Sequence, residues 1–486
     1  MRYFDLISQT LKNQNIGNNL YEQLPLQFYS TNYHDFYDKI KNYLDSCIHK
    51  FGFKNNVFIL TDSKDKLSEI KNSKTINEKI IDLLSSDFNV IHKSLSVSKS
   101  VDTDEIHASE YYLNETINLI EAEKNNFIFI SLGSGAITDL LKHALYLNKK
   151  DTIFISIPTA MTVTAFTSSF SVVDLEGAKR TRQSKIVNAT FWIEPLLQAA
   201  PLNLSRAGFG DLLARFVAYG DWYLSYKLGI AENYNELAYH LMEIYADPLK
   251  QMANCFQQEF LTSDAIEIIS ASLAMAGISM SLSGETTPLS GYEHVISHGL
   301  DFLRLTSRRS LVLHGEQVAL ASLTSAMTFD WLLEFEEFDT KKMRTMNEKE
   351  IQKIITQFMS NAPFFGNKND ADEINPDELN KVKKIFAEDY IIKSDKWNLA
   401  KENISEFQNN WAEIKTHITK ITMRSDEMQR LLEQANLPTY PEATFPTTTA
   451  LEFRWALRFS PFIRSRFSVA DFIFWIGEDP CIAAAI

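Results

Sequence analysis

Short apolar runs alternate with helix-like patterns between Asn55 and about Ala200. Three of these runs are VFIL (57–60), FIFISLG (127–133) and TIFISIP (152–158), and each leads directly into a polar residue, a glycine or a proline. Strand-length apolar runs that alternate with helical patterns are typical of a parallel sheet in an α/β layer. We therefore expect loops at the carboxyl ends of these strands, where such sheets bind ligands.

After Pro201 the pattern changes to long helical periods. One apolar stripe is formed by Leu212, Leu213, Phe216 and Val217, and further helical patterns run from about Tyr234 onward. Strand patterns almost vanish there. The stretch 361–378 is rich in Asn, acidic residues, Pro and Gly, which predicts a loop within this helical region.

The predicted fold class is α/β. We expect an N-terminal, Rossmann-like parallel-sheet domain over residues 1–200, in which 1–54 form an N-terminal extension or a helical lead-in. An all-helical domain over 201–486 follows, with the active site in the cleft between the two domains. A length of 486 residues with 45% hydrophobic side chains also favours two domains, because a single core seldom grows that large.

Charge and cysteine content narrow the function classes. The formal net charge of -14 argues against nucleic-acid binding. Cys47, Cys255 and Cys481 are too few and too scattered for a disulfide framework or a thiolate zinc site, which favours a reducing, cytoplasmic location. We expect no membrane partner, since no leader or run of about eighteen apolar residues is evident.

Two loops after predicted strands are candidates for nucleotide binding. GSGAITDLLKH (133–143) opens a helix, so its backbone N–H groups are suited to a pyrophosphate, although glycines here are often plain turn chemistry. Its spacing also departs from GxGxxG, because no third glycine occurs between Gly135 and Asp139. PTAMTVTAFTSSFSVV (158–173) is dense in hydroxyls and suits either a cofactor loop or an ordinary β segment. Asp62, after the first strand, suits either a ribose hydroxyl or a helix cap.

Histidines and one aspartate suggest a metal site. SGYEHVISHGLDF (290–302) places His294 and His298 four residues apart, on one helix face, and His314 precedes a glycine at the expected start of another helix. Asp211 in AGFGDLLARF would complete a set of three ligands, with one coordination position left for substrate. The alternative is that Asp211 caps a helix after Gly210 and that the histidines are ordinary core or surface residues.

A metal ion held by these ligands suits alcohol chemistry. A Lewis acid lowers the pKa of an alcohol and stabilises the alkoxide that expels hydride to a cofactor. His298, one turn from a ligand, is placed to relay the proton of the alcohol.

Taken together and in order, these segments resemble the superfamily of iron-containing alcohol dehydrogenases, glycerol dehydrogenases and dehydroquinate synthases. The similarity is greatest to its sn-glycerol-1-phosphate dehydrogenase branch. The segments that carry it are GSGAITDLLKH, PTAMTVTAFTSS, AGFGDLLARF with Asp221-Trp222, SGYEHVISH, LHGEQVA and ALRFSPFIRSRFSVADFIFWIG (456–477).

The resemblance implies roles for individual residues. It implies Asp211, His294 and His314 as ligands of one divalent ion, usually zinc or nickel in this branch and iron in relatives, and His298 as a residue that faces substrate. It also implies NAD or NADP, a small phosphopolyol or ketone substrate, and a homo-oligomer. The implied cofactor-binding residues are Asp62, Gly133, Ser134, Gly135, Ala136, Ile137, Asp139, Thr159, Thr162 and Ser168.

One departure from the family concerns the substrate. The family pattern PTAPSMDGYASS has an aspartate that contacts substrate, and this chain has Thr164 in its place, so we assign that catalytic position to Thr164. Met161 and Ala165 also replace the usual proline and glycine. Basic residues that follow, Lys179, Arg180 and Arg182, suit a phosphate or simply a solvated turn.

The leading hypothesis is metal-dependent, NAD(P)-linked interconversion of a small ketone and a secondary alcohol, with dihydroxyacetone phosphate and sn-glycerol 1-phosphate as the preferred pair. Two alternatives remain: a synthase or lyase of the same fold that uses NAD transiently, and a noncatalytic relative with an altered pocket. Asp211 favours a dehydrogenase, because cyclising synthases of the superfamily usually have glutamate as this ligand.

Overall fold

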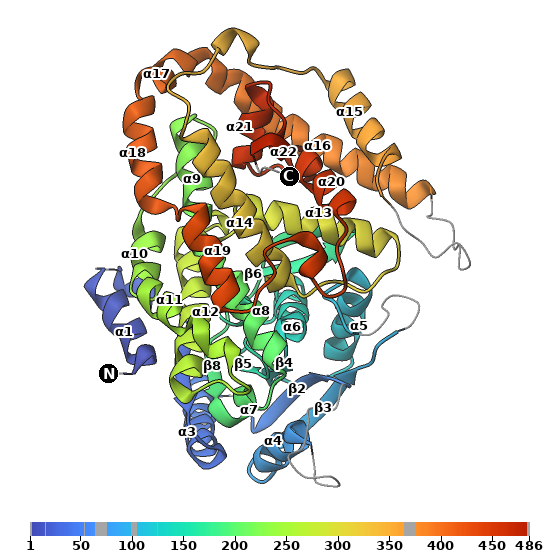
Figure 1. The fold of residues 1–486 in the computed structure, drawn as a ribbon. Coiled ribbons are helices and arrows are strands. Elements are labelled where there is room, and N and C mark those ends of the chain that lie inside the picture. Colours follow the sequence, from blue (N-terminus) through green and yellow to red (C-terminus); the bar gives the residue numbers. More distant parts are fainter. Residues whose placement is uncertain are drawn as a thin grey trace. The chain divides into compact units, whose positions relative to one another are not determined.

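The structure is a computed structural model that describes residues 2–14, 16–52, 54–63, 75–98, 105–123, 125–363 and 376–483. The chain divides into two compact units (Figure 1). Unit 1 comprises Met1–Leu175, Lys179–Phe209 and His240–Gly284, and unit 2 comprises Glu176–Ala178, Gly210–Tyr239 and Glu285–Ile486. Most of the loop predicted over 361–378, namely 364–375, lies outside the described residues.

Unit 1 is built on a six-stranded sheet in the order β1-β8-β5-β4-β2-β3. Every pair of neighbouring strands is parallel. The strands are β1 (Leu26–Ser30), β2 (Asn56–Asp62), β3 (Asn89–Leu95), β4 (Ile128–Gly133), β5 (Phe154–Pro158) and β8 (Ala189–Ile193). A separate two-stranded sheet is formed by β6 (Phe170–Leu175) and β7 (Ala178–Gln183). The predicted α/β fold class is confirmed, and the three apolar runs lie in β2, β4 and β5.

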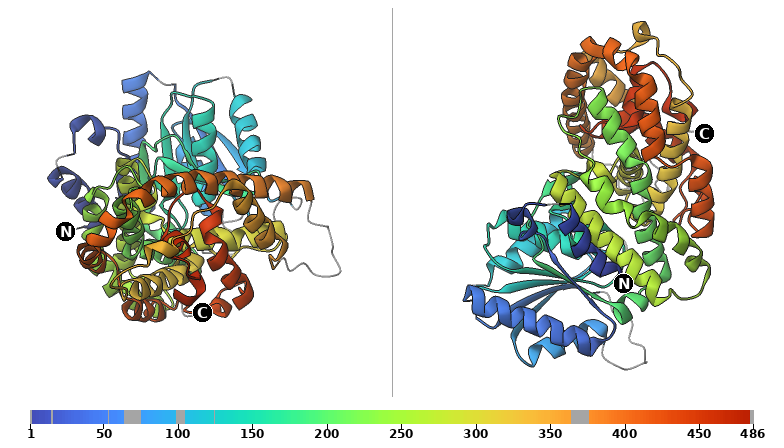
Figure 2. Two further views of the ribbon diagram at one scale, coloured as in Figure 1. Left: turned by 90° about the horizontal axis from the view of Figure 1, so that it is seen from above. Right: turned by 90° about the vertical axis from the view of Figure 1, so that its left-hand side faces the viewer.

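Helices cover both faces of this sheet. One face packs against α3 (Tyr33–Phe51), α4 (Ile76–Ser85) and α7 (Glu194–Gln198), and α3 is the long blue helix along the sheet in the right-hand view of Figure 2. The other face packs against α5 (Glu110–Glu121) and α6 (Gly135–Leu147). Strands β2, β4 and β5 bury both of their faces, which explains why their sequences are continuously apolar rather than alternating.

The N-terminal segment differs from the predicted lead-in, because residues 26–30 form an edge strand of the sheet. β1 pairs in parallel with β8, which lies more than a hundred residues later in the chain, and Phe28 stacks on Phe191 with ring centroids 4.6 Å apart. This pairing depends on a distant partner, so the local pattern of LQFYS does not reveal it.

Helix α12 (Ser263–Ser283) belongs to unit 1, although the sequence pattern assigned everything after residue 200 to the helical domain. It is the one described helix long and apolar enough to span a membrane, but 83% of its apolar window is buried. It packs on α1 (Tyr3–Asn13), on α7 and on the short helix η1 (Thr164–Phe166). A helix that is apolar on all sides needs neighbours on all sides, which unit 1 supplies.

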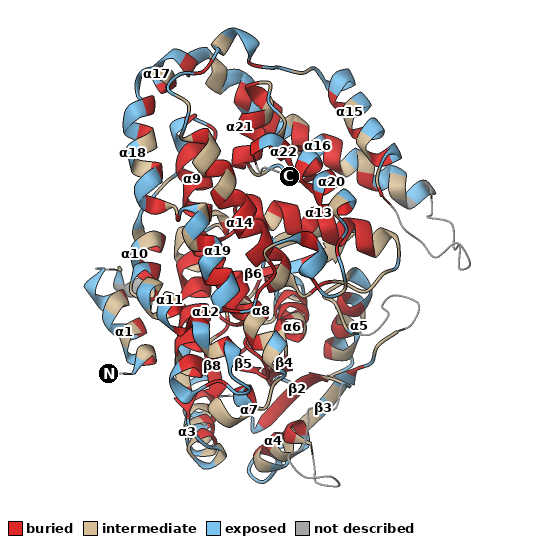
Figure 3. Cartoon of the chain, in the orientation of Figure 1, coloured by how far each residue is buried: buried red, intermediate tan, exposed pale blue. Residues whose placement is uncertain are grey.

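The regular elements among the described residues of unit 2 are helices, apart from the first residue of β7. Helices α13 (Tyr292–Thr306) and α14 (His314–Leu332) pack against each other and are almost entirely buried (Figure 3). The other long helices of this unit are α9 (Ala218–Lys227), α15 (Glu348–Ser360), α16 (Pro376–Ala400), α18 (Trp411–Ile421), α19 (Ser425–Gln434) and α20 (Ala450–Ile463). Shorter ones are α17 (Ile404–Asn409), α21 (Val469–Trp475) and α22 (Pro480–Ala483), and α8 (Leu202–Leu212) enters unit 2 with its last residues.

Candidate metal centre

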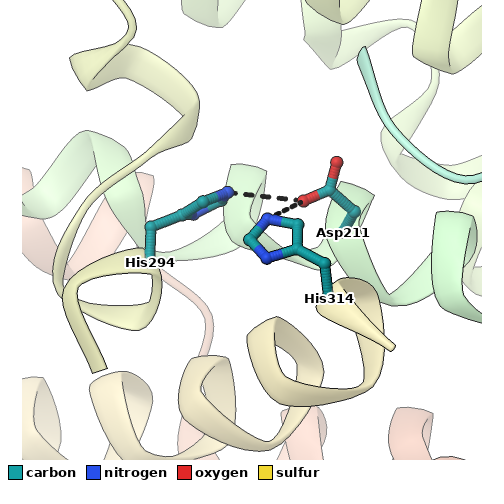
Figure 4. Close-up of side chains that lie close together, drawn as sticks. All are labelled: Asp211, His294 and His314. Carbon is teal, nitrogen blue, oxygen red and sulfur yellow. Dashed lines mark ion pairs between the residues drawn. The ribbon is translucent and has the colours of Figure 1, made fainter. Parts of the chain in front are cut away.

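Three side chains from three helices of unit 2 point toward one another (Figure 4). Asp211 lies at the end of α8, His294 in the first turn of α13, and His314 at the first position of α14. The Oδ1 atom of Asp211 is 3.3 Å from Nε2 of His294 and 3.6 Å from Nε2 of His314. One ligand atom from each residue lies within 4.8 Å of the others, a spacing that suits one metal ion.

One glycine allows the helices that carry Asp211 and His314 to approach closely. A Cβ atom on Gly210 would lie 2.3 Å from the carbonyl oxygen of Gly315, much closer than any real contact. Gly210 directly precedes Asp211, and Gly315 directly follows His314. The missing side chain at Gly210 therefore lets the aspartate and the histidine come together.

The outer nitrogen of each histidine ring has a polar partner. Nδ1 of His294 is 2.9 Å from Oε1 of Glu293, a carboxylate oxygen that also accepts the Gly291 backbone N–H at 2.6 Å. Nδ1 of His314 is 3.2 Å from the hydroxyl oxygen of Ser297, and that hydroxyl donates to Oε1 of Gln317 at 2.7 Å.

These partners test whether the site fits a metal ion. A carboxylate can only accept hydrogen bonds, and the Ser297 hydroxyl already donates its hydrogen to Gln317. Each histidine therefore donates a hydrogen bond from Nδ1. In the neutral rings both Nε2 atoms then face the Asp211 carboxylate with lone pairs. Three acceptors that converge need a cation between them, and one carboxylate with two imidazoles is a ligand set that zinc, nickel and iron accept.

The electrostatics of His294 agree with a site that attracts positive charge. Burial disfavours its charged form, but the carboxylates of Asp211 and Glu293 outweigh burial and raise the pKa of His294 to about 9. A cation at Nε2, whether a proton or a metal ion, is therefore stabilised there.

His298 lies beside the three candidate ligands. Its ring centroid is 6.4 Å from that of His294 and 6.3 Å from that of His314, and the residue is only 6% exposed. The predicted placement on one helix face with His294 is what α13 provides.

The two predicted cofactor loops are neighbours in unit 1. Gly133 at the end of β4 is paired with Pro158 at the end of β5, and the Thr159 N–H donates to the Gly133 carbonyl at 3.0 Å. Ser134, the residue before α6, forms no side-chain capping hydrogen bond. An uncapped helix start next to a strand end is an arrangement that binds phosphate.

The structure gives some predicted cofactor residues other partners. The Ile137 side chain is fully buried in the core, so only its backbone remains for a nucleotide, and Gly135 is needed because a Cβ there would lie 2.2 Å from Val163. Asp139 is also buried, with its Oδ1 atom 3.2 Å from Nζ of Lys142. Of the others, Ser168 and Thr159 are buried, whereas Ser134, Ala136, Thr162 and Asp62 are partly exposed.

Lys142 holds a loop of unit 1 in place, a role that we did not predict from the sequence. Its ammonium group is fully buried and donates to the carbonyl oxygens of Ala165 at 2.8 Å, Ser168 at 3.1 Å and Phe170 at 2.5 Å. It thereby holds the loop that contains Thr164, which begins η1 in unit 1. A lysine three residues after an aspartate, in a largely apolar helix, was the available signal.

The basic residues Lys179, Arg180 and Arg182 lie on strand β7 rather than in a turn. The turn of this hairpin is Glu176-Gly177, where both residues have positive φ. Lys179 and Arg180 are half-buried and Arg182 is exposed, and this placement alone does not distinguish a phosphate site from a solvated strand.

Comparison with known proteins agrees with the fold. Residues 42–201 match the family described as iron-containing alcohol dehydrogenase. Two curated relatives are both named glycerol-1-phosphate dehydrogenase [NAD(P)+]. The one from Bacillus subtilis is 32% identical over 215 residues, which cover 43% of this chain and 52% of the relative. The one from Staphylothermus marinus is 34% identical over 215 residues, which cover 43% and 57%.

The chain thus spans about half the length of the curated relatives it matches. The predicted resemblance to this dehydrogenase family is confirmed. Among solved structures, sulfoacetaldehyde reductase from Bifidobacterium kashiwanohense has a TM-score of 0.51 at 11% identity and covers 94% of this chain and 98% of its own. Alcohol dehydrogenase from Oenococcus oeni has a TM-score of 0.50 at 14% identity, with 94% of each chain covered. At such identities the likeness shows the fold alone.

Proposed function

We propose that this protein is a metal-dependent NAD(P)-linked dehydrogenase that interconverts a small ketone and a secondary alcohol. The observation that carries the proposal is the convergence of Asp211, His294 and His314, whose ligand atoms lie within 4.8 Å of one another. A metal with three protein ligands keeps a position for substrate, as catalytic sites do. The family of residues 42–201 and the names of the curated relatives point to the same reaction class.

The proposal assigns the cofactor and the metal ion to separate groups of residues. In unit 1, the start of α6 and the loop after β5 would hold the pyrophosphate and the nicotinamide side of NAD or NADP. In unit 2, Asp211 and the two histidines would hold zinc or nickel, or iron as in relatives. The ion, when bound, supplies a Lewis acid that lowers the pKa of the substrate hydroxyl.

His298 has the proton-transfer role in this proposal. In the oxidation direction, the alcohol loses its hydroxyl proton to His298 and a hydride to NAD(P)⁺, which leaves the ketone. The buried imidazole lies next to both ligand histidines without being needed as a ligand itself. A positioned general base of this kind typically contributes a factor of about 10² to 10⁴ in rate.

The preferred substrate pair in this proposal is dihydroxyacetone phosphate and sn-glycerol 1-phosphate, because the curated relatives carry that name. Thr164 bears on this choice. It supplies a neutral hydroxyl where the family pattern supplies a carboxylate, so a hydrogen bond to a substrate hydroxyl would be weaker here.

The proposal is tested with purified full-length protein. We expect about one zinc or nickel ion per chain by elemental analysis, and oxidation of NADH or NADPH with dihydroxyacetone phosphate in preference to dihydroxyacetone or other three-carbon ketones. Asp211→Asn serves as the control that lacks the anionic ligand. A metal-free protein without nucleotide affinity would refute the proposal.

Thr164, in place of the family aspartate, is also compatible with a second candidate function, which the same assay tests. A synthase or lyase that uses NAD transiently would retain NAD through purification and convert substrate without net absorbance change at the nicotinamide wavelength.

A further inference from the structure

We propose that Glu293 is a positioning residue that orients His294 for metal binding, an inference that rests on the proposed metal site. Glu293 directly precedes His294 at the start of α13, and its side chain is fully buried. The family resemblance assigned it no role. Its Oε1 atom receives two donors, the Gly291 N–H at 2.6 Å and Nδ1 of His294 at 2.9 Å.

The hydrogen bond to Glu293 determines which nitrogen of His294 faces the ligand site. Because the carboxylate accepts the Nδ1 proton, the lone pair of the neutral ring lies on Nε2, which points to Asp211 at 3.3 Å. Without this acceptor the ring would lose both its tautomer preference and its orientation. A carboxylate on the outer nitrogen also makes an imidazole a better electron donor to a metal.

Side-chain hydrogen bonds fix the backbone at the start of the helix that carries Glu293. Asp221 accepts the backbone N–H of Tyr292 at 2.8 Å and that of Val469 at 2.5 Å, and so ties the start of α13 to the start of α21. Arg466 donates to the Ser290 carbonyl and to the Thr286 hydroxyl, in the segment just before α13. This network explains why Asp221 and the C-terminal segment accompany the histidine motif.

The charge of Arg466 also bears on Glu293. Burial lowers the pKa of Arg466, whereas Glu285, Glu293 and Asp221 act in the opposite direction and stabilise its positive charge. The buried carboxylate at position 293 therefore has a half-buried cation in its vicinity. A buried carboxylate without such compensation would be costly.

The two histidines have supports of different strength. His294 is supported by a carboxylate, whereas His314 is supported by the neutral Ser297 hydroxyl at 3.2 Å. Loss of Glu293 should therefore weaken metal binding more than loss of the Ser297 hydroxyl. This order is specific to a positioning role, since both residues are buried in the same helix.

The test measures Zn²⁺ affinity of the full-length, metal-free protein by competition with a chromophoric chelator. We expect Glu293→Gln to weaken Zn²⁺ binding by about 10-fold to 100-fold, and Ser297→Ala to weaken it less. The matched control is Glu452→Gln, which removes another buried carboxylate of unit 2, one that caps α20 and pairs with Arg309 far along the chain from the ligands. This control should keep wild-type affinity even if it loses stability.

A spectroscopic measurement separates positioning from general loss of structure. The visible absorption of Co²⁺ reports ligand geometry, so it should change in Glu293→Gln and remain as in wild type in Glu452→Gln. In Zn²⁺-loaded wild type with ¹⁵N-labelled histidine, His294 should carry a proton on Nδ1. An unprotonated Nδ1, or equal Zn²⁺ affinity of Glu293→Gln and wild type, would overturn the inference.

The experiment also separates this inference from the proposed function, because no cofactor or substrate is present. Wild type that binds Zn²⁺ but does not oxidise NADH or NADPH would refute the dehydrogenase, while the affinity difference would still support Glu293. Dehydrogenase activity with unchanged affinity in Glu293→Gln would refute only the role of Glu293.

Discussion

Two of the three candidate ligands follow a residue in the chain that affects their position. Gly210 precedes Asp211, and Glu293 precedes His294. Gly210 has no side chain, so two helices can approach, whereas the glutamate adds a hydrogen bond that orients a ring. At the scale of single residues, the motifs therefore contain both the ligands and the adjacent residues that position them.

His298→Asn tests the proton-transfer role. We expect kcat to fall by about 100-fold or more, because a general base contributes about 10² to 10⁴, while the zinc content stays as in wild type. Steady-state kinetics of ketone reduction and elemental analysis of the same sample give both values. A parallel loss of metal would instead make His298 a ligand.

At this scale the sequence predicts which candidate ligands lie together, but not the residues that support them. Spacing places His294 and His298 on one helix face, and the family motifs add Asp211 and His314. Glu293, Ser297 and Gln317 are recognisable only as polar positions on helices that turn out to be buried. Their hydrogen bonds depend on how α13 and α14 pack, which periodicity does not encode.

Among the elements, the end of α8 lies close to the start of α14 beside two of the ligands. We expect Gly210→Ala to separate Asp211 from His314, because the new Cβ would lie 2.3 Å from the Gly315 carbonyl oxygen and one helix must shift. Zn²⁺ affinity should fall by about 10-fold or more, comparable to the loss of a supporting residue.

The control for this substitution is Gly17→Ala, since a Cβ on Gly17 meets nothing within 4 Å. Isothermal titration with Zn²⁺ compares the two variants with wild type. If Gly210→Ala and Gly17→Ala bound Zn²⁺ alike, the close approach would have no part in forming the site.

The loop after β5 depends on a single buried cation of α6. Lys142→Met is expected to destabilise the protein by about 3 to 5 kcal/mol, because it leaves the buried Asp139 carboxylate without its partner and three carbonyls without their donor.

Urea unfolding measures this cost, and the double variant Lys142→Met with Asp139→Leu provides the comparison. Removal of both buried charges should cost less than removal of the lysine alone. An additive double variant would show that the two groups do not act as a pair.

The sequence pattern predicts an element well when the element is buried on both faces, because its residues are then continuously apolar. Strands β2, β4 and β5 are apolar runs buried on both faces, so the pattern reveals them. β1 carries polar residues and forms an edge through pairing with β8, so its local pattern is ambiguous. α12 lies within the helical patterns predicted from about Tyr234 onward, but its assignment to unit 1 depends on tertiary contacts.

For the whole molecule, the proposed metal links three helices of unit 2 and should therefore stabilise that unit. Free Zn²⁺ at a hundred times its Kd is expected to add about 2.7 kcal/mol to the stability of the fold that binds it. Scanning calorimetry with Zn²⁺ and with a chelator should show this difference in wild type. In Asp211→Asn the two scans should coincide, and a Zn²⁺-dependent shift that persisted there would place the stabilising ion elsewhere.

The composition of unit 1 also has a consequence for the order in which the protein folds during synthesis. The sheet strands are complete in the chain by Ile193, yet α12, which packs on α1, α7 and η1, emerges from the ribosome only after a further stretch that belongs to unit 2. Until then, apolar surface that α12 covers stays accessible to chaperones or to other nascent chains. The ribosome must therefore synthesise the end of α8, with Asp211, and the unit 2 segment after it before unit 1 can fold completely. A ribosome pause between residues 209 and 263 would lengthen the time for which this apolar surface is exposed.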